Sequence, residues 1–241
     1  MQDIVFAHSM AKGDDPNEDI YDLSSSRLVL CDGASESFDS CTWAKILARN
    51  YINHEQINAR MLAESIKDYD TAQAHRELNW AQQLASGRGS YSTLLGYFYS
   101  SRDNSIWLDC VGDSSAFVIR DSDLAMLFSY PYRRPEEYLD RPRLLSTQQE
   151  KNVPLNASLS TPPWLSTRFA LRHKVKYHVL LLTDAIACWL LKNRDNAQSV
   201  ACLLNLTDND HNIFEDFVAE KRKSGEMKTD DTTMIHVTIT A

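Results

Sequence analysis

The chain has 241 residues, of which 43% are hydrophobic and 24% are charged. This balance is ordinary for a globular protein that buries a core, and the length favours a single domain spanning residues 1–241. A formal net charge of −8 argues against extended electrostatic binding to nucleic acid, so proteins or small molecules are the expected partners. Five cysteines without a CxxC pair fit a reducing cytoplasm. The sequence shows neither a basic leader at its N-terminus nor an apolar run long enough to span a membrane, so we do not expect the chain to enter one.

The first half of the chain contains predicted strands and two predicted helices. Short apolar runs predict strands at 4–6 and 27–31. Asp39 or Ser40 can cap a helix, and Asn58 can cap a second, longer helix that extends to about residue 85. Four strands are predicted next, as an antiparallel meander: 92–99, 106–111, 115–119 and 124–128.

Residues 129–176 interrupt this regularity with six of the seven prolines and with several arginines. We interpret the segment as a long surface excursion, which either contacts substrate or is an irregular solvated connection. The remaining predicted elements are a strand at 177–182, helices at 185–191, 196–206 and 213–223, and a closing strand at 232–240. Strands in two groups, with helices gathered between them, indicate an α+β domain with one core.

Four aspartates stand at the edges of the apolar runs: Asp32, Asp113, Asp184 and Asp230. A short apolar run bounded by turn residues is typical of a buried strand, so each carboxylate should emerge where a strand leaves the core. Acids held close together repel each other, and they then take up protons or bind a cation. A cluster with oxygen ligands only suits Mg²⁺ or Mn²⁺. The pattern therefore predicts a two-metal hydrolase of phosphate esters.

Short motifs surround these aspartates: Asn17-Glu18-Asp19, Asp32-Gly33, Ser92-Thr93, Val111-Gly112-Asp113-Ser114, Leu182-Thr183-Asp184 and Asp230-Asp231-Thr232-Thr233. In this order and spacing they resemble the metal-dependent Ser/Thr protein phosphatases of the type 2C family, over almost the whole chain. The stretch 32–37, with Trp43 in the following helix, is similar to a bacterial branch that lacks the double glycine after the Asp-Gly pair. The fold that this resemblance implies is α+β, with two packed antiparallel β-sheets flanked by helices on both outer faces.

The resemblance also implies a set of metal ligands. Asp32 would bridge two Mn²⁺ or Mg²⁺ ions, with the Gly33 carbonyl on one ion and with Asp184 and Asp230 on the other. Asp113, together with Asp184, would serve a third and weaker ion.

The implied catalytic residues are the same three aspartates, Asp32, Asp184 and Asp230, together with Glu18 and Asp19, which would orient metal-bound waters. Two cations can activate a water molecule for attack on phosphorus and can neutralise the phosphoryl oxygens. The implied activity is hydrolysis of phosphoserine and phosphothreonine in proteins, and a cognate Ser/Thr kinase is an expected partner. We expect neither nucleic acid nor a membrane as a partner.

Two positions depart from the family pattern. Asp14 stands where many members carry an arginine that binds substrate phosphate, so Lys12, Arg133 and Arg134 are the candidate substrate-binding cations, with solvated surface charge as the alternative for each. Ala34 replaces a histidine that some members use to protonate the leaving group. Two other functions therefore stay open, namely a catalytically weak relative that binds phosphoproteins or a kinase, and a phosphohydrolase for a small metabolite.

Overall fold

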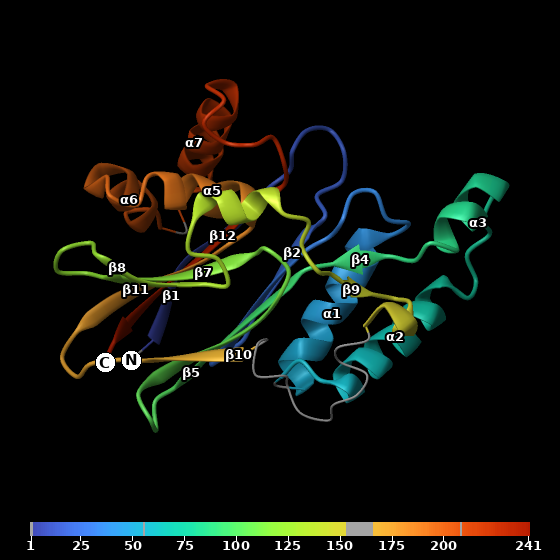
Figure 1. Cartoon of the computed structure of the whole chain (residues 1–241), viewed down its shortest axis with the longest axis horizontal. Helices are drawn as coiled ribbons and strands as arrows, with labels where there is room; N and C mark the ends of the chain where they lie inside the picture. Colours follow the sequence, from blue (N-terminus) through green and yellow to red (C-terminus); the bar gives the residue numbers. More distant parts are fainter. Residues whose placement is uncertain (1, 55, 153–165, 208) are drawn as a thin grey trace.

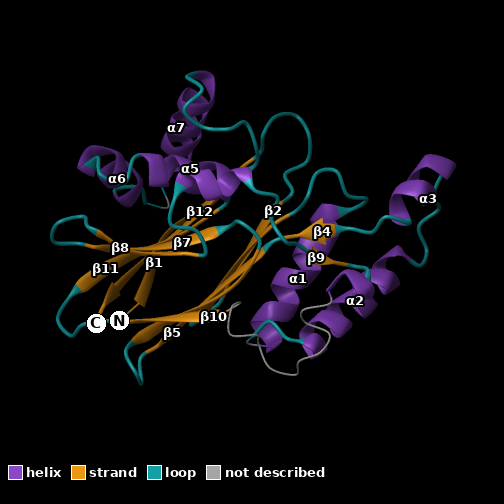
Figure 2. Cartoon of the chain, viewed as in Figure 1, coloured by secondary structure: helices purple, strands orange, loops and turns teal. Residues whose placement is uncertain are grey.

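The computed structural model describes residues 2–54, 56–152, 166–207 and 209–241. Within these residues two five-stranded antiparallel sheets pack face to face, and helices cover both outer sides (Figures 1 and 2). The predicted α-β-β-α sandwich is therefore confirmed. No helix in the described part of the chain is both long and apolar enough to cross a membrane.

The first sheet joins the two ends of the chain. Its strands, in spatial order, are β1 (Gln2–Met10), β12 (Thr232–Thr240), β11 (Lys176–Leu182), β7 (Ser115–Arg120) and β8 (Met126–Tyr130). The helices on its outer face are α5 (Asp184–Lys192), α6 (Ala197–Leu204) and α7 (His211–Lys223). The two termini lie side by side because β1 and β12 are paired, with Gln2 opposite Ile239 (Figure 1).

The second sheet is built mainly from the first half of the chain. Its strands, in spatial order, are β10 (Ser166–Ala170), β6 (Ser105–Val111), β5 (Leu94–Ser100), β3 (Arg27–Asp32) and β2 (Asp19–Leu23). The elements outside it are the helices α1 (Ser40–His54), α2 (Ala59–Gln73) and α3 (Trp80–Ser86), the short strand pair β4 (Tyr91–Ser92) and β9 (Leu145–Ser146), and the 3₁₀ turn Gln149–Asn152. Another 3₁₀ turn, Pro135–Leu139, lies against α5 on the side of the first sheet.

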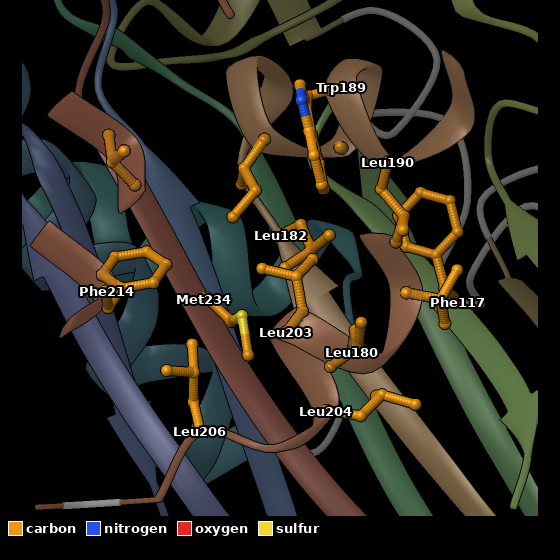
Figure 3. Packing of buried hydrophobic residues seen from close by; sticks show 14 of the residues in the cluster. Phe117, Leu180, Leu182, Trp189, Leu190, Leu203, Leu204, Leu206, Phe214 and Met234 are labelled. Atoms are coloured by element: carbon orange, nitrogen blue, oxygen red, sulfur yellow. The ribbon is translucent and has the colours of Figure 1, made fainter. Parts of the chain in front are cut away.

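Three apolar layers hold the sandwich together. On β11, Val179 and Leu181 point between the sheets while Leu180 and Leu182 point toward α5–α7, as the alternation of a strand requires. Figure 3 shows the layer beneath these helices, where Trp189 and residues of α6 and α7 meet the sheet. Because both faces of β11 are buried, its residues 179–182 form a continuous apolar run.

The single long helix predicted after Asn58 is wrong. Asn58 caps α2 as expected, since its side chain accepts from the Met61 backbone N–H. A second cap follows at Asn79, whose side chain and that of Gln82 form a capping box that starts α3. Trp80 is consequently 76% exposed on a helix that projects at the edge of the molecule (Figure 1) and does not extend the apolar face of α2.

The predicted meander is also wrong, because β5 and β6 lie in one sheet and β7 and β8 in the other. The chain crosses between the sheets at Gly112, where φ is +111° and an added Cβ would lie 2.6 Å from Cγ2 of Thr93. Only glycine fits such a crossing without strain.

The predicted surface excursion at 129–176 contains regular elements that its sequence did not indicate. These are the 3₁₀ turns, β9 and β10. Residues 153–165, which carry Pro154, Pro162 and Pro163, lie outside the described residues. Strand β2 was likewise not predicted, because a five-residue strand next to a polar loop has too little apolar pattern.

Candidate functional site

Carboxylates from five separate segments gather at one end of the sandwich. Asp32 ends β3 and stands opposite Asp19, the first residue of β2. Asp113 lies at the crossing between the sheets, Asp184 begins α5, and Asp230 precedes β12. A cleft of about 990 Å³ is lined by all of these except Asp19. The structure thus brings together the aspartates that the sequence singled out.

The backbone at Asp32 is fixed by the Ser92-Thr93 motif and by Gly33. The Asp32 N–H donates to the Thr93 hydroxyl at 2.9 Å, and the Thr93 N–H donates to the Asp32 carbonyl at 2.8 Å. The Gly33 N–H donates to the Glu18 carbonyl at 3.2 Å, and a Cβ at Gly33 would lie only 3.0 Å from that oxygen and 2.9 Å from Cβ of Ser40. Glycine is therefore required beside Asp32 by close backbone packing.

Two carboxylates of the cluster each have a buried oxygen without a hydrogen-bond partner. Asp19 accepts a hydrogen bond from the Thr233 hydroxyl on Oδ2, at 2.7 Å, whereas its Oδ1 has no partner. Oδ1 of Asp184 is in the same situation. A buried carboxylate oxygen without a partner is costly, so each of these atoms suits a bound proton or a cation.

Burial and mutual repulsion shift the acids of the cluster in one direction. Burial raises the pKa of Asp32 well above its ordinary value, and the charges of neighbouring aspartates add to the effect. Burial likewise raises the pKa of Asp19 to about 8 and that of Asp113 to about 6. The pKa of Asp184 is raised for the same reason. At neutral pH the cluster therefore holds protons or needs positive charge.

A lysine supplies one positive charge inside the cleft. The Lys228 ammonium lies 3.1 Å from Oδ2 of Asp184 and 2.5 Å from Oδ2 of Asp230. Among the described residues, no three His, Cys, Asp or Glu side chains surround a single point as a preformed cage for an ion. The unpartnered buried oxygens and the oxygen-only donors nevertheless fit Mn²⁺ or Mg²⁺, so the residues present suit the implied metals.

The loop before β2 is tied to the cleft by Asp231. Its carboxylate accepts hydrogen bonds from the backbone N–H groups of Lys12, at 2.7 Å, and of Glu18, at 2.8 Å. The Glu18 side chain accepts from Ser40 and lies 3.0 Å from the Lys12 ammonium, which also donates to Ser35. Glu18 is thus held beside Gly33. Its carboxylate compensates much of the Lys12 charge, which is then less available to a substrate.

The other predicted substrate-binding residues lie elsewhere. The backbone N–H groups of Arg133 and Arg134 bind Glu137, and Arg133 lines a separate pocket together with Arg194. Neither arginine lines the acidic cleft, and the exposed Asp14 does not line it either.

The cleft contains other cations that the sequence did not single out. Besides Lys228, they are Arg88, Arg141 and Lys151. Arg141 lies in the same proline-rich segment, 129–176, as Arg133 and Arg134, but it lines the cleft whereas they do not.

Arg222 is a further residue that sequence reasoning missed. It lies in the last turn of α7, where basic residues typically complement the helix dipole. Its guanidinium instead donates to the Ala11 carbonyl and the Thr232 hydroxyl, each at 2.9 Å, and also to the Asp230 carbonyl. It therefore ties α7 to the chain on both sides of the acid cluster.

Comparison with known proteins gives matches to solved structures alone. No protein-family model and no curated protein sequence matches the chain. The serine/threonine phosphatase PstP/Ppp of Mycobacterium tuberculosis is 15% identical with a TM-score of 0.60, covering 100% of this chain and 99% of that one. A structure of the PstP catalytic domain in complex with two manganese ions is 15% identical with a TM-score of 0.56, covering 98% and 97%.

PppA of Pseudomonas aeruginosa, described as a key regulatory component of T6SS, is 16% identical with a TM-score of 0.55, covering 98% of this chain and 96% of that one. At such identities the likeness establishes the fold. The chain has the fold of the type 2C Ser/Thr phosphatases, as its motifs predict.

Proposed function

We propose that the chain is a metal-dependent phosphoprotein phosphatase that hydrolyses phosphoserine and phosphothreonine. The observation that carries the proposal is the cluster of Asp19, Asp32, Asp113, Asp184 and Asp230 at the end of the sandwich. A cluster of repelling, partly unpartnered acids weakens a fold unless cations compensate it, and the fold is one that Ser/Thr phosphatases share.

The metal-holding residues that we propose are Asp32, the Gly33 carbonyl, Asp184 and Asp230, with Asp113 and Asp184 at a third and weaker site. When bound, two divalent cations supply a nucleophilic water at neutral pH and compensate the charge of the phosphoryl oxygens. In this set, Oδ1 of Asp184 is buried and the Asp230 side chain is partly exposed.

The other residues of the site bind and orient. Glu18 and Asp19 are the proposed residues for orienting metal-bound waters. Oδ1 of Asp19 has no hydrogen-bond partner, which supports this role, whereas the two carboxylate oxygens of Glu18 already bind Ser40 and Lys12. Arg88, Arg141 and Lys151 add positive charge to the cleft, which favours a dianionic phosphate and acidic residues near it. Ala34 also lines the cleft and has no proton to donate, so the leaving oxygen must take its proton from water or from another group.

The cations of the cleft come from several segments of the chain. Arg88 follows α3, whereas Arg141 and Lys151 flank β9. A phosphorylated protein brings acidic residues beside its phosphate, so it can pair with these cations through more than the phosphate alone. We therefore favour a phosphoprotein substrate and treat residues 1–241 as one phosphatase-like domain. A cognate kinase and a cytoplasmic location are predictions from the sequence.

A phosphatase assay tests the proposal. The protein is stripped of metal with chelator and assayed with an aryl phosphate and with phosphoserine and phosphothreonine peptides, with and without Mn²⁺ or Mg²⁺. We expect turnover only when metal is added, and none for Asp32→Asn. Undiminished turnover in excess chelator would refute the mechanism. Metal binding without turnover would favour the phosphoprotein-binding or kinase-binding alternative, and turnover of small metabolites without peptides would favour a metabolite phosphohydrolase.

A further inference from the structure

Lys228 occupies an unusual position for a lysine, in contact with two acids that are proposed metal ligands. It lies in the segment between α7 and β12, and its ammonium is within 3.1 Å of Asp184 and 2.5 Å of Asp230. The preceding residue, Met227, is buried in the layer beneath the helices, so the backbone is anchored there. The side chain of Lys228 is nevertheless 63% exposed.

We infer that Lys228 is a built-in competitor for the metal, whose ammonium occupies the position between Asp184 and Asp230 in the metal-free protein and leaves when a divalent cation binds. The inference rests on the proposed function, because it uses Asp184 and Asp230 as ion ligands. It adds that the chain carries its own monovalent substitute for the ion.

Lys228 and a metal ion exclude each other for two physical reasons. An ammonium group only donates hydrogen bonds, so it cannot coordinate a cation. It also repels a divalent ion held by the same carboxylates, because like charges at a few ångströms repel strongly in a partly buried site.

The lysine is an incomplete substitute for the ion. One positive charge compensates Asp184 and Asp230 in part, yet Oδ1 of Asp184 remains buried without a partner. A divalent ion brings more charge and more ligand positions, so it displaces the lysine. The exposed, flexible stem can swing into water without disturbing Met227. Lys228 therefore weakens metal affinity while protecting the metal-free protein from repulsion.

Calorimetric titration of the chelator-stripped full chain with Mn²⁺ tests this inference. The variants are Lys228→Met, which removes the charge, and Lys228→Arg, which keeps it. Lys67→Met is the matched control, since Lys67 is exposed on α2 and its substitution changes the net charge equally. We expect Lys228→Met to bind Mn²⁺ about 10-fold more tightly than the control, as the loss of one competing charge-assisted hydrogen bond implies. Lys228→Arg should remain close to the wild type.

Thermal unfolding gives a second readout that does not depend on activity. Without metal, Lys228→Met should melt below Lys67→Met, because Asp184 and Asp230 lose their compensating charge. With saturating Mn²⁺ the difference in melting temperature between the two variants should disappear or change sign, because the ion then compensates both acids.

Each result decides the inference. An affinity for Mn²⁺ equal to that of Lys67→Met would overturn it, and so would weaker binding, which would mean that Lys228 organises the acids for the ion. Binding by Lys228→Met where the wild type shows none would support it strongly, whereas no binding by either protein would overturn it. Failure of the proposed function is distinguishable, since it would appear as wild-type protein that binds Mn²⁺ but has no phosphatase turnover.

Discussion

Asp113→Asn should stabilise the metal-free protein at neutral pH. Asp113 lies at the crossing between the two sheets and is only 9% exposed. Burial, followed by the charge of Asp184, raises its pKa to about 6 from 3.8. Asparagine has nearly the same shape but no charge, so the substitution removes the repulsion without leaving a cavity.

The sign and size of the effect follow from this pKa. Between pH 3.8 and about 6 the folded protein holds a proton that the unfolded chain has already lost. The free energy of unfolding therefore falls as the pH rises through this window, and the full cost is present above pH 6. A pKa raised by about 2 corresponds to about 3 kcal/mol, since each pKa unit is worth about 1.36 kcal/mol. The variant avoids this cost.

Denaturant unfolding in excess chelator measures the difference. We expect Asp113→Asn to exceed the wild type by about 3 kcal/mol at about pH 7.5 and by less than about 1 kcal/mol at about pH 4, where the wild-type carboxyl is protonated in the folded protein and partly protonated in the unfolded chain. Equal stability at neutral pH would refute the reasoning that Asp113 is held among repelling charges. With Mn²⁺ present the advantage should shrink, because the proposed weak ion site then loses a ligand.

The remaining predictions concern metal binding, substrate binding and packing. Asp32→Asn should reduce turnover to background and weaken Mn²⁺ binding, as measured by phosphatase assay and calorimetry; normal turnover with normal metal content would contradict the bridging role. Arg141→Ala should raise KM for a phosphopeptide about 10-fold with little change in kcat, whereas Arg133→Ala, outside the cleft, should not; the reverse order would restore the sequence-based assignment. Gly33→Ala should lower the free energy of unfolding by about 1–3 kcal/mol, because the added Cβ meets Ser40 and the Glu18 carbonyl, and an unchanged melting temperature would show that this backbone relaxes freely.

Elements buried on two faces were the easiest to predict from sequence. Strand β11 is apolar on both sides, so its run and the acid that follows it, Asp184, are visible without knowledge of the fold. The break between α2 and α3 was harder, because Trp80 continues a helical spacing while Asn79 starts a new helix. Helical periodicity alone cannot distinguish one helix from two when the later apolar residues are exposed.

Contacts between distant segments could not be predicted from local pattern. Lys228 and Asp184 are 44 positions apart, and Arg222 and Ala11 are 211 apart. Although Lys228 is close to Asp230 in the chain, nothing near either basic residue in the sequence indicates its contact with the distant segment. The acids were predictable because each follows or precedes a strand, whereas the cations reach them from helix ends and loops.

The position of the acid cluster links the stability of the fold to its occupancy by cations. The carboxylates lie where β2, β3 and β12 begin or end, so repulsion among them acts on the strand ends of both sheets. The surrounding hydrogen bonds oppose that repulsion: Thr233 binds Asp19, and Arg222 joins α7 to the carbonyl of Asp230. Because neither bond supplies a positive charge to a carboxylate oxygen, relief of the remaining repulsion is left to protons, to Lys228 and the other cations of the cleft, and to metal. Binding of a divalent ion should therefore raise the stability of both sheets together, which is the coupling expected when an ion binds only to the folded state.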